Sequence, residues 1–250
     1  MTVIQPIRPA STIMIVRQSS SCCEVFMLRR NSGSAFAGGM YVFPGGRVEG
    51  DDHLHKYDIR RQGPGDSQRA QQAALGNEWR GYWIAGIRES FEEAGLLLAY
   101  REDGQLLEFS KQETREKFRD YRSLLNGGEI SLLEICRREK LKLAADRIHF
   151  HNRFVTPLGR PRRFDTRFFI AEAPPGQTGQ HDEQETVDSI WISPEDALQM
   201  NDDDEFGLMG VTRHQLEQLG KYDSVNAILA AAATQVDFPT RRPILSRNEK

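Results

Sequence analysis

The stretch "RESFEEAG", residues Arg88 to Gly95, places three glutamates close together in a segment whose other residues are mostly apolar. In a helix each residue advances by about 100°, so Glu89, Glu92 and Glu93 share one narrow face. The apolar residues of the same segment fall on the opposite face, and they are Ile84, Ile87, Phe91 and Ala94. Such a helix packs on one side and gathers negative charge on the other. Like charges at these spacings destabilise an isolated helix by about 0.2–0.5 kcal/mol per pair, so we expect a positive group to offset them.

The composition limits the class of protein. The chain has 250 residues, 38% hydrophobic and 28% charged, which is enough to fill the core of one large domain or of two small ones. A net charge of −3 provides no basic field and disfavours nucleic acid as a partner. No apolar run reaches the roughly 18 residues of a membrane span, so no membrane is expected. Three cysteines without a CxxC pair favour reduced thiols and a cytoplasmic location.

Strands and helices are both expected, but they do not alternate regularly. Strands are predicted at residues 11–18, 22–30, 40–46, 147–157, 163–173 and 186–192, and helices at 79–95, within 111–144, after Ser193 and across 211–233. The polar stretch 50–78 is predicted to be an exposed insertion with some helix around 67–75. The irregular order favours an α+β sandwich with a mixed sheet over a parallel barrel.

Three carboxylates on one helical face are suited to a hard divalent cation such as magnesium, which prefers carboxylate and water oxygens. The turn Gly45-Gly46 precedes the helix, and glycine lets a backbone carbonyl approach a metal or ligand closely. Arg88 is expected to pair with Glu92 four residues on. The alternative is an ordinary surface helix with a solvated acidic side.

The spacing favours the metal-binding interpretation. "RESFEEAGLL" fits the pattern Arg-Glu-apolar-x-Glu-Glu-x-Gly-apolar with Ser90 as the departure, and "FPGG" lies upstream. Together these strongly resemble the signature of the Nudix hydrolases. Where that signature carries a further glutamate after the glycines, this chain has Asp52, followed by a long spacer before the helix. We expect Asp52 to stabilise the junction between the loop and the helix.

The long insertion, together with "MLRRNS" (27–32), "YVFPGG" (41–46) and "RRFDTRFF" (162–169), resembles the peroxisomal-type Nudix enzymes that cleave coenzyme A and acyl-coenzyme A. The resemblance implies one Nudix domain over residues 1–250, an α/β/α sandwich with a mixed sheet, with an insertion at about 50–78 and a helical cap at about 105–145. Two alternatives stay open: a pyrophosphatase of ADP-ribose, NADH or dinucleoside polyphosphates, and a nucleotide-sensing module without catalysis. The ending Asn248-Glu249-Lys250 is not the peroxisomal address of the animal members, so a peroxisomal location is not expected.

The resemblance also implies residue roles, a Mg²⁺ or Mn²⁺ cofactor and a small-molecule diphosphate substrate, with a homodimer as the expected assembly. The implied metal ligands are Glu89, Glu92, Glu93 and the carbonyl of Gly45; the implied catalytic residues are Glu89, Glu93, Arg88 and Glu185; the substrate-binding candidates are Arg29, Arg30, Gly46 and Arg163. The general base is either Glu89 or a loop glutamate, Glu183 or Glu185, and Glu185 is favoured because it immediately precedes a strand. For the three arginines the alternatives are a solvated strand end and a structural Arg–Asp pair.

Overall fold

The computed structural model describes residues 5–20, 22–34, 37–183 and 185–243, so the C-terminal tripeptide lies outside the described residues. Within these ranges an eight-stranded mixed sheet forms the centre, in the order β10-β2-β1-β9-β8-β11, with β3 beside β2 and β4 beside β1. The pairing of β1 with β9 is parallel, and that of β1 with β2 is antiparallel. The strands are β1 (Ile7–Gln18), β2 (Cys23–Arg30), β3 (Tyr41–Val42), β4 (Gly45–Arg47), β8 (Ile148–Val155), β9 (Arg163–Glu172), β10 (Thr186–Ile192) and β11 (Thr240–Arg241).

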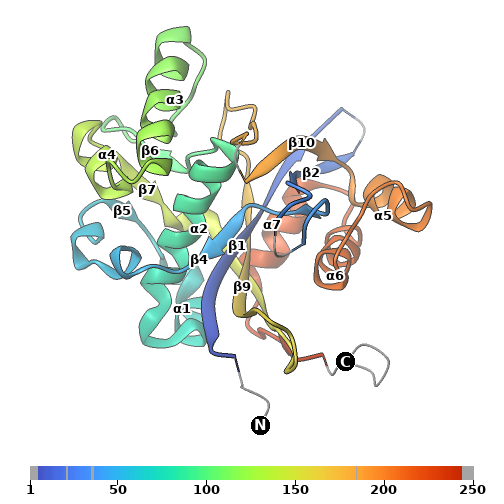
Figure 1. Cartoon of the computed structure of the whole chain (residues 1–250). Coiled ribbons are helices and arrows are strands. Elements are labelled where there is room, and N and C mark those ends of the chain that lie inside the picture. The colour runs from blue at the N-terminus through green and yellow to red at the C-terminus, as the bar shows by residue number, and fades with distance from the viewer. Residues whose placement is uncertain (1–4, 21, 35–36, 184, 244–250) are drawn as a thin grey trace.

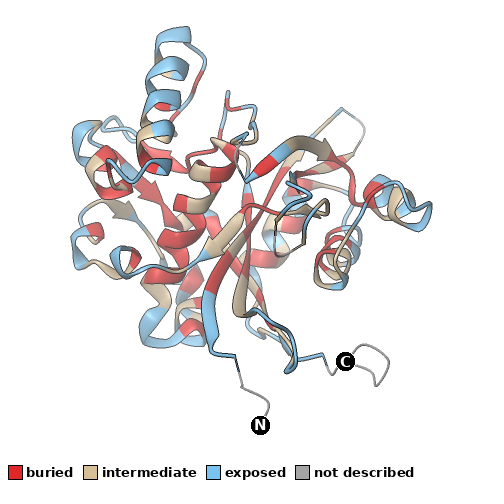
Figure 2. Ribbon diagram, viewed as in Figure 1, coloured by how far each residue is buried: buried red, intermediate tan, exposed pale blue. Residues whose placement is uncertain are grey.

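Helices cover both faces of this sheet, because its strands are apolar on both faces. Along β1, Ile13 and Ile15 join the core on the α2 side, whereas Met14 and Val16 join a second core on the opposite side. Figure 1 shows α1 (Arg69–Leu75) and α2 (Trp79–Ala94) on one side, and α5 (Pro194–Asp202), α6 (Gly210–Leu219) and α7 (Val225–Thr234) on the other. Buried residues line both interfaces in Figure 2. The predicted α/β/α sandwich with a mixed sheet is confirmed.

A smaller sheet and two further helices lie beside α2. This sheet has the order β5-β7-β6 in the described residues and consists of β5 (Arg61–Gln62), β6 (Ala99–Tyr100) and β7 (Lys142–Ala144). The helices α3 (Gln112–Asn126) and α4 (Leu132–Arg138) complete this region. The stretch 50–78 is not simply exposed as predicted, because Asp52, Tyr57, Gln68, Gln71 and Leu75 are buried in it. Tyr57 and Leu75 join the core on the α2 side, and Gln68 and Gln71 are buried because they hydrogen-bond to backbone groups of other elements.

The helix α2 is held tightly against the central sheet. Trp83 donates from Nε1 to the carbonyl of Ile148 at 2.9 Å, and the Ser11 hydroxyl donates to the Tyr82 carbonyl at 2.7 Å. Gly95 ends the helix as predicted, with φ of 67°, and its N–H donates to the Phe91 carbonyl at 3.0 Å. The sheet therefore fixes the position of the helix that carries the glutamates.

Most predicted elements are confirmed, with two differences. The predicted strand 40–46 is split into β3 and β4, because Pro44 lies between two stretches that pair with different neighbours. The predicted helix across 211–233 is split into α6 and α7, and Ser224 caps the second by accepting from the Ala227 N–H. In the described part of the chain, no helix combines the length and apolarity needed to cross a membrane.

Candidate functional site

Arg88 lies at the centre of the candidate site, and its guanidinium is almost completely enclosed. Its Nε and Nη2 donate to the two carboxylate oxygens of Asp52, each at 3.0 Å. Its Nη1 donates to Glu89 at 3.0 Å and to Glu92 at 2.7 Å. The expected pair with Glu92 is confirmed, and Arg88 is the positive group that offsets the clustered negative charge of the helix.

Asp52 joins the insertion to the helix, as expected. Its side chain is only 1% exposed, and besides the fork to Arg88 it accepts from the N–H of Glu49 at 2.8 Å. Arg88 also donates to the carbonyl of Arg47 at 2.8 Å, directly after the glycine turn. The buried pair therefore connects β4, the start of the insertion and α2.

The expected glycine turn, Gly45-Gly46, is the start of strand β4 in the structure, and it lies directly against the glutamates. The N–H of Gly45 donates to Glu93 at 2.9 Å. A Cβ atom on Gly46 would lie 2.6 Å from Oε1 of Glu89, so only glycine leaves room for that carboxylate. The turn and the helix form one unit in which backbone and carboxylates are in contact.

The end of β2 and the loop before β10 complete the site on one side. The Arg30 guanidinium lies 4.0 Å from the Glu93 carboxylate and 3.4 Å from that of Glu185. The backbone N–H of Asn31 donates to the Glu185 carbonyl at 3.0 Å, which fixes the start of β10 beside the end of β2. The Glu185 side chain is 64% exposed and faces solvent, whereas Glu93 is enclosed.

The side chains of Glu93, Glu89 and Glu92 are only 9%, 12% and 20% exposed, which excludes the solvated acidic face, and this burial raises their pKa. Burial raises the pKa of Glu93 to about 8, although the Gly45 N–H and Arg30 oppose the shift. Burial also raises the pKa of Glu89 well above its ordinary value, and the charges of Glu93 and Glu92 add to this while Arg88 opposes it. The carboxylates are thus held where their negative charge is unfavourable unless a cation lies close by.

Arg122 of α3 is a site residue that the sequence analysis missed. It donates from Nε to the Glu92 carbonyl at 2.8 Å and from Nη2 to the Glu93 carbonyl at 2.7 Å. These carbonyls lie in the last turn of α2, where backbone acceptors lack partners within the helix. The available signal was its spacing, because Arg122 follows Phe118 by four residues and precedes Leu125 by three, which places it on the buried face of α3.

Two predicted substrate-binding arginines lie apart from this cluster. Arg29 follows strand alternation onto the face opposite Arg30, where its guanidinium lies 6.0 Å from the centre of the Tyr41 ring. Arg163 donates to the carbonyls of Thr156 and Gln5, each at 3.3 Å. It pairs in register with Ile7, five residues from the Thr12 that faces Gly45, or about 16 Å along the strand. These positions do not support a substrate contact for either residue.

The donor chemistry of the cluster fits a hard divalent cation. Glu89, Glu92 and Glu93 supply carboxylate oxygens. Because Gly46 has no side chain, nothing separates its backbone from the Glu89 carboxylate. Among the described residues, however, no three His, Cys, Asp or Glu side chains group closely enough to enclose a metal ion. Arg88 and the Gly45 N–H instead bind the carboxylate oxygens.

Comparison with known proteins agrees with this geometry. Residues 57–211, more than half of the chain, match the family model "NUDT19 Nudix domain". The chain belongs to the Nudix family. The crystal structure of a Nudix hydrolase from Alicyclobacillus acidocaldarius has the same fold, with a TM-score of 0.75 and 22% identity, and the match covers 90% of this chain and 96% of that one.

Two curated relatives extend the comparison. "Acyl-coenzyme A diphosphatase NUDT19" of Gallus gallus is 27% identical over 237 residues, which covers 81% of this chain and 62% of the relative. The Xenopus laevis protein of the same name is 25% identical over 213 residues, covering 73% and 56%. This Nudix chain therefore spans about three fifths of the length of the curated relatives that it matches.

Gly46→Ala is expected to displace the Glu89 carboxylate. In the diphosphatase assay described under Proposed function, kcat/KM should fall by about tenfold to a hundredfold, since small misplacements of catalytic groups cost up to about 10² in rate. The substitution adds one methyl group against a flexible carboxylate, so the melting temperature should change little. Gly50→Ala is the matched control, because a Cβ atom there meets nothing within 4 Å. Steady-state kinetics of the two variants check the prediction, and equal rates would contradict it.

Arg122→Gln is expected to destabilise the last turn of α2, the helix that carries the three glutamates. Losing charged hydrogen bonds to two buried carbonyls should lower the free energy of unfolding by about 1–3 kcal/mol. Arg119→Gln removes an exposed arginine from the same helix and should change the free energy of unfolding by less than about 0.5 kcal/mol. Urea unfolding of both variants measures the difference, and similar midpoints would show that Arg122 does not hold this turn.

Proposed function

We propose that this Nudix chain hydrolyses a diphosphate linkage in coenzyme A, acyl-coenzyme A or a related nucleoside diphosphate derivative, with Mg²⁺ or Mn²⁺. The observation that carries the proposal is the cluster of three largely enclosed glutamates, in which Arg88 binds Glu89 and Glu92 and the Gly45 N–H binds Glu93. The names of the two vertebrate relatives support the coenzyme A substrate. The inserted segment at 50–78 and the cap at 105–145 belong to the same proposal, as regions that shape the substrate site.

The proposed metal ligands are Glu89, Glu92, Glu93 and the Gly45 carbonyl. A divalent ion held by these groups would neutralise charge on the diphosphate oxygens and lower the pKa of a bound water. Arg88 keeps Glu89 and Glu92 oriented by direct hydrogen bonds. Gly46 leaves the turn open to the phosphate groups of the substrate.

Next to the glutamates, Arg30 is the proposed phosphate-binding residue and Glu185 the proposed general base. The Arg30 Nε is buried and makes no hydrogen bond within the described part of the chain, so this guanidinium has donor capacity for a phosphate oxygen. Glu185 is exposed at the mouth of the site and close to Arg30, which suits it to accept the proton of the attacking water. Glu89 is the alternative base, as the sequence analysis left open.

A substrate panel with product identification tests the proposal. Purified protein is incubated with Mg²⁺ or Mn²⁺ and with coenzyme A, acetyl-coenzyme A, ADP-ribose, NADH and diadenosine tetraphosphate. We expect the highest kcat/KM for the coenzyme A compounds, with 3′,5′-ADP and a phosphopantetheine as products. A preference for ADP-ribose, NADH or the dinucleotide would favour the pyrophosphatase alternative. Nucleotide binding by calorimetry without any product over hours would favour the sensor.

The assembly and location remain predictions. The expected homodimer is tested by sedimentation of the purified chain. The expected cytoplasmic location is tested by imaging the full-length protein in its own cells.

A further inference from the structure

A second polar cavity, of about 420 Å³, lies at the edge of the small sheet. It shares no lining residue with the glutamate cluster described above. Its wall comes from β5 and the residue before it in the middle of the insertion, from β6 and the turn after it, and from the segment between α4 and the start of β7. The lining residues are Arg60, Gln62, Tyr100, Arg101, Glu102, Gly104, Lys140 and Lys142.

The cavity is strongly basic in a chain whose net charge is −3. Four of its lining residues are cationic and only Glu102 is anionic. Glu102 pairs with Lys140 at 3.1 Å, and Arg101 pairs with Asp103 at 2.8 Å. These pairs use two of the four cations and leave two for another partner.

Arg60 and Lys142 are the two cations without an acidic partner among the described residues. Lys142 is exposed, and it is the residue of β7 that pairs with Tyr100 of β6. The Nε of Arg60 is buried and makes no hydrogen bond to any described group. A guanidinium with a desolvated, unused donor is suited to bind a phosphate oxygen.

The backbone at Lys140 adds an independent observation. Lys140 follows α4 with φ of 53°, the left-handed region in which glycine ordinarily ends a helix. The N–H of Leu141 closes the helix end by donating to the Cys136 carbonyl at 2.9 Å. A lysine in this left-handed conformation has a higher backbone energy than glycine. The lysine nevertheless adds an ammonium group to the wall of the cavity.

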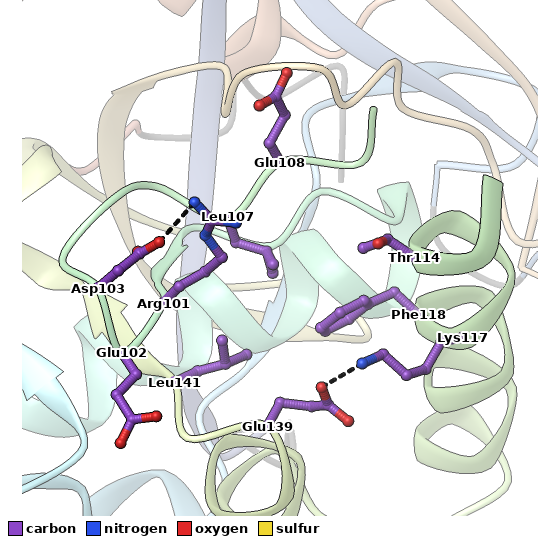
Figure 3. Close-up of a pocket in the computed structure, with 10 residues that line it drawn as sticks. All are labelled: Arg101, Glu102, Asp103, Leu107, Glu108, Thr114, Lys117, Phe118, Glu139 and Leu141. Carbon is purple, nitrogen blue, oxygen red and sulfur yellow. Dashed lines mark hydrogen bonds and ion pairs between the residues drawn. The ribbon is translucent and has the colours of Figure 1, made fainter. Parts of the chain in front are cut away.

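An adjoining cavity of about 520 Å³ has the opposite character (Figure 3). Leu107, Phe118 and Leu141 point into it from three sides, and its cations are already paired, Arg101 with Asp103 and Lys117 with Glu139. Four carboxylates line it against two cations, so an anion is disfavoured there. The preference for an anion is therefore local to the smaller cavity.

We propose that the cavity between Arg60, Lys140 and Lys142 binds the phosphate group of a small molecule, at a site separate from the glutamate cluster. This inference does not depend on the proposed hydrolysis, because it concerns other residues and requires no divalent ion. The bound group is a phosphate monoester or diphosphate, since Arg60 offers a planar fork of donors and Lys142 an ammonium group, and neither has an acidic partner among the described residues.

Isothermal titration calorimetry with sodium pyrophosphate tests the proposal, in EDTA and a buffer without phosphate or sulfate. We expect saturable binding by the wild-type chain, weakened about tenfold in Arg60→Gln, because a charged hydrogen bond from a buried donor contributes roughly one factor of ten or more. Lys142→Gln should weaken binding about threefold, because an ion pair of an exposed lysine contributes less. Lys221→Gln removes an exposed lysine from the opposite side of the central sheet and should bind like wild type. Thermal melting confirms that each variant is folded.

Three outcomes would overturn the proposal: no saturable binding by the wild-type chain, equal affinity in wild type and Lys142→Gln, or loss of binding in Arg30→Gln, which removes the cation beside the glutamates. The last result would place pyrophosphate at the glutamate cluster instead. Lys142 is exposed, so its substitution leaves the fold intact and decides the question even if Arg60→Gln is unstable. Absence of diphosphatase activity in the wild-type chain would contradict the proposed function and leave this binding result unaffected.

Discussion

Glu93→Gln is expected to lower kcat by about 10²- to 10⁴-fold, whichever diphosphate proves to be the substrate. The amide keeps the volume of the side chain and can still accept from the Gly45 N–H, which lies 2.9 Å from the carboxylate. What it loses is the negative charge that a divalent ion requires. The loss of rate should therefore come with an almost unchanged fold.

Thermal melting separates loss of charge from loss of structure in this variant. Burial raises the pKa of Glu93 to about 8, so its charge opposes folding above its ordinary pKa, and the neutral amide should melt at the same or a higher temperature in EDTA. Manganese should then stabilise wild type but not Glu93→Gln, since a ligand at 100 times its Kd adds about 2.7 kcal/mol to the native state. Equal stabilisation of both proteins by manganese would place the metal elsewhere.

Glu78→Gln is the matched control for this experiment. Glu78 directly precedes the same helix, but its side chain is 67% exposed and lies 4.0 Å from His53. Its substitution should leave both kcat and the manganese response at wild-type values. Glu185→Gln provides a second comparison, because the proposed base should lower kcat without removing the stabilisation by manganese.

Local patterns in the sequence predicted the elements and much of the glutamate helix. The β-branched content of stretches such as 11–18 predicted the strands, and the helix was expected to end at Gly95, as it does. The pair of Arg88 with Glu92 followed from their spacing of four residues. These features depend on neighbours within one element, and the sequence contains that information directly.

Contacts between elements could not be predicted from local sequence patterns in this way. The helical wheel places the three glutamates opposite the apolar face, which is also the pattern of a solvated helix. They are buried because the turn at Gly45 and the helix carrying Arg122 pack over them, from positions far apart in the sequence. The approach of Arg30 to Glu93 likewise depends on the placement of β2 beside the helix end.

Arg88→Met is expected to lower the free energy of unfolding by about 3–5 kcal/mol, the usual cost of removing one partner from a buried ion pair. The methionine removes both hydrogen bonds to Asp52, whose carboxylate is only 1% exposed and has little access to water. Arg69→Met removes the partner of Asp66 from an exposed pair and should cost less than about 1 kcal/mol. Urea unfolding of both variants measures the contrast.

The double variant Arg88→Met/Asp52→Leu distinguishes a stranded charge from lost packing. If the cost arises from the uncompensated Asp52 carboxylate, replacing it with an apolar side chain of similar size should recover a substantial part of the stability. Activity should not recover in parallel, because Glu89 and Glu92 still lack the guanidinium that orients them. A double variant that is no more stable than Arg88→Met would show that the buried pair is not the source of the loss. The expected outcome, stability restored without activity, would show that Arg88 has two separate roles: it joins the insertion to the helix, and it positions the carboxylates.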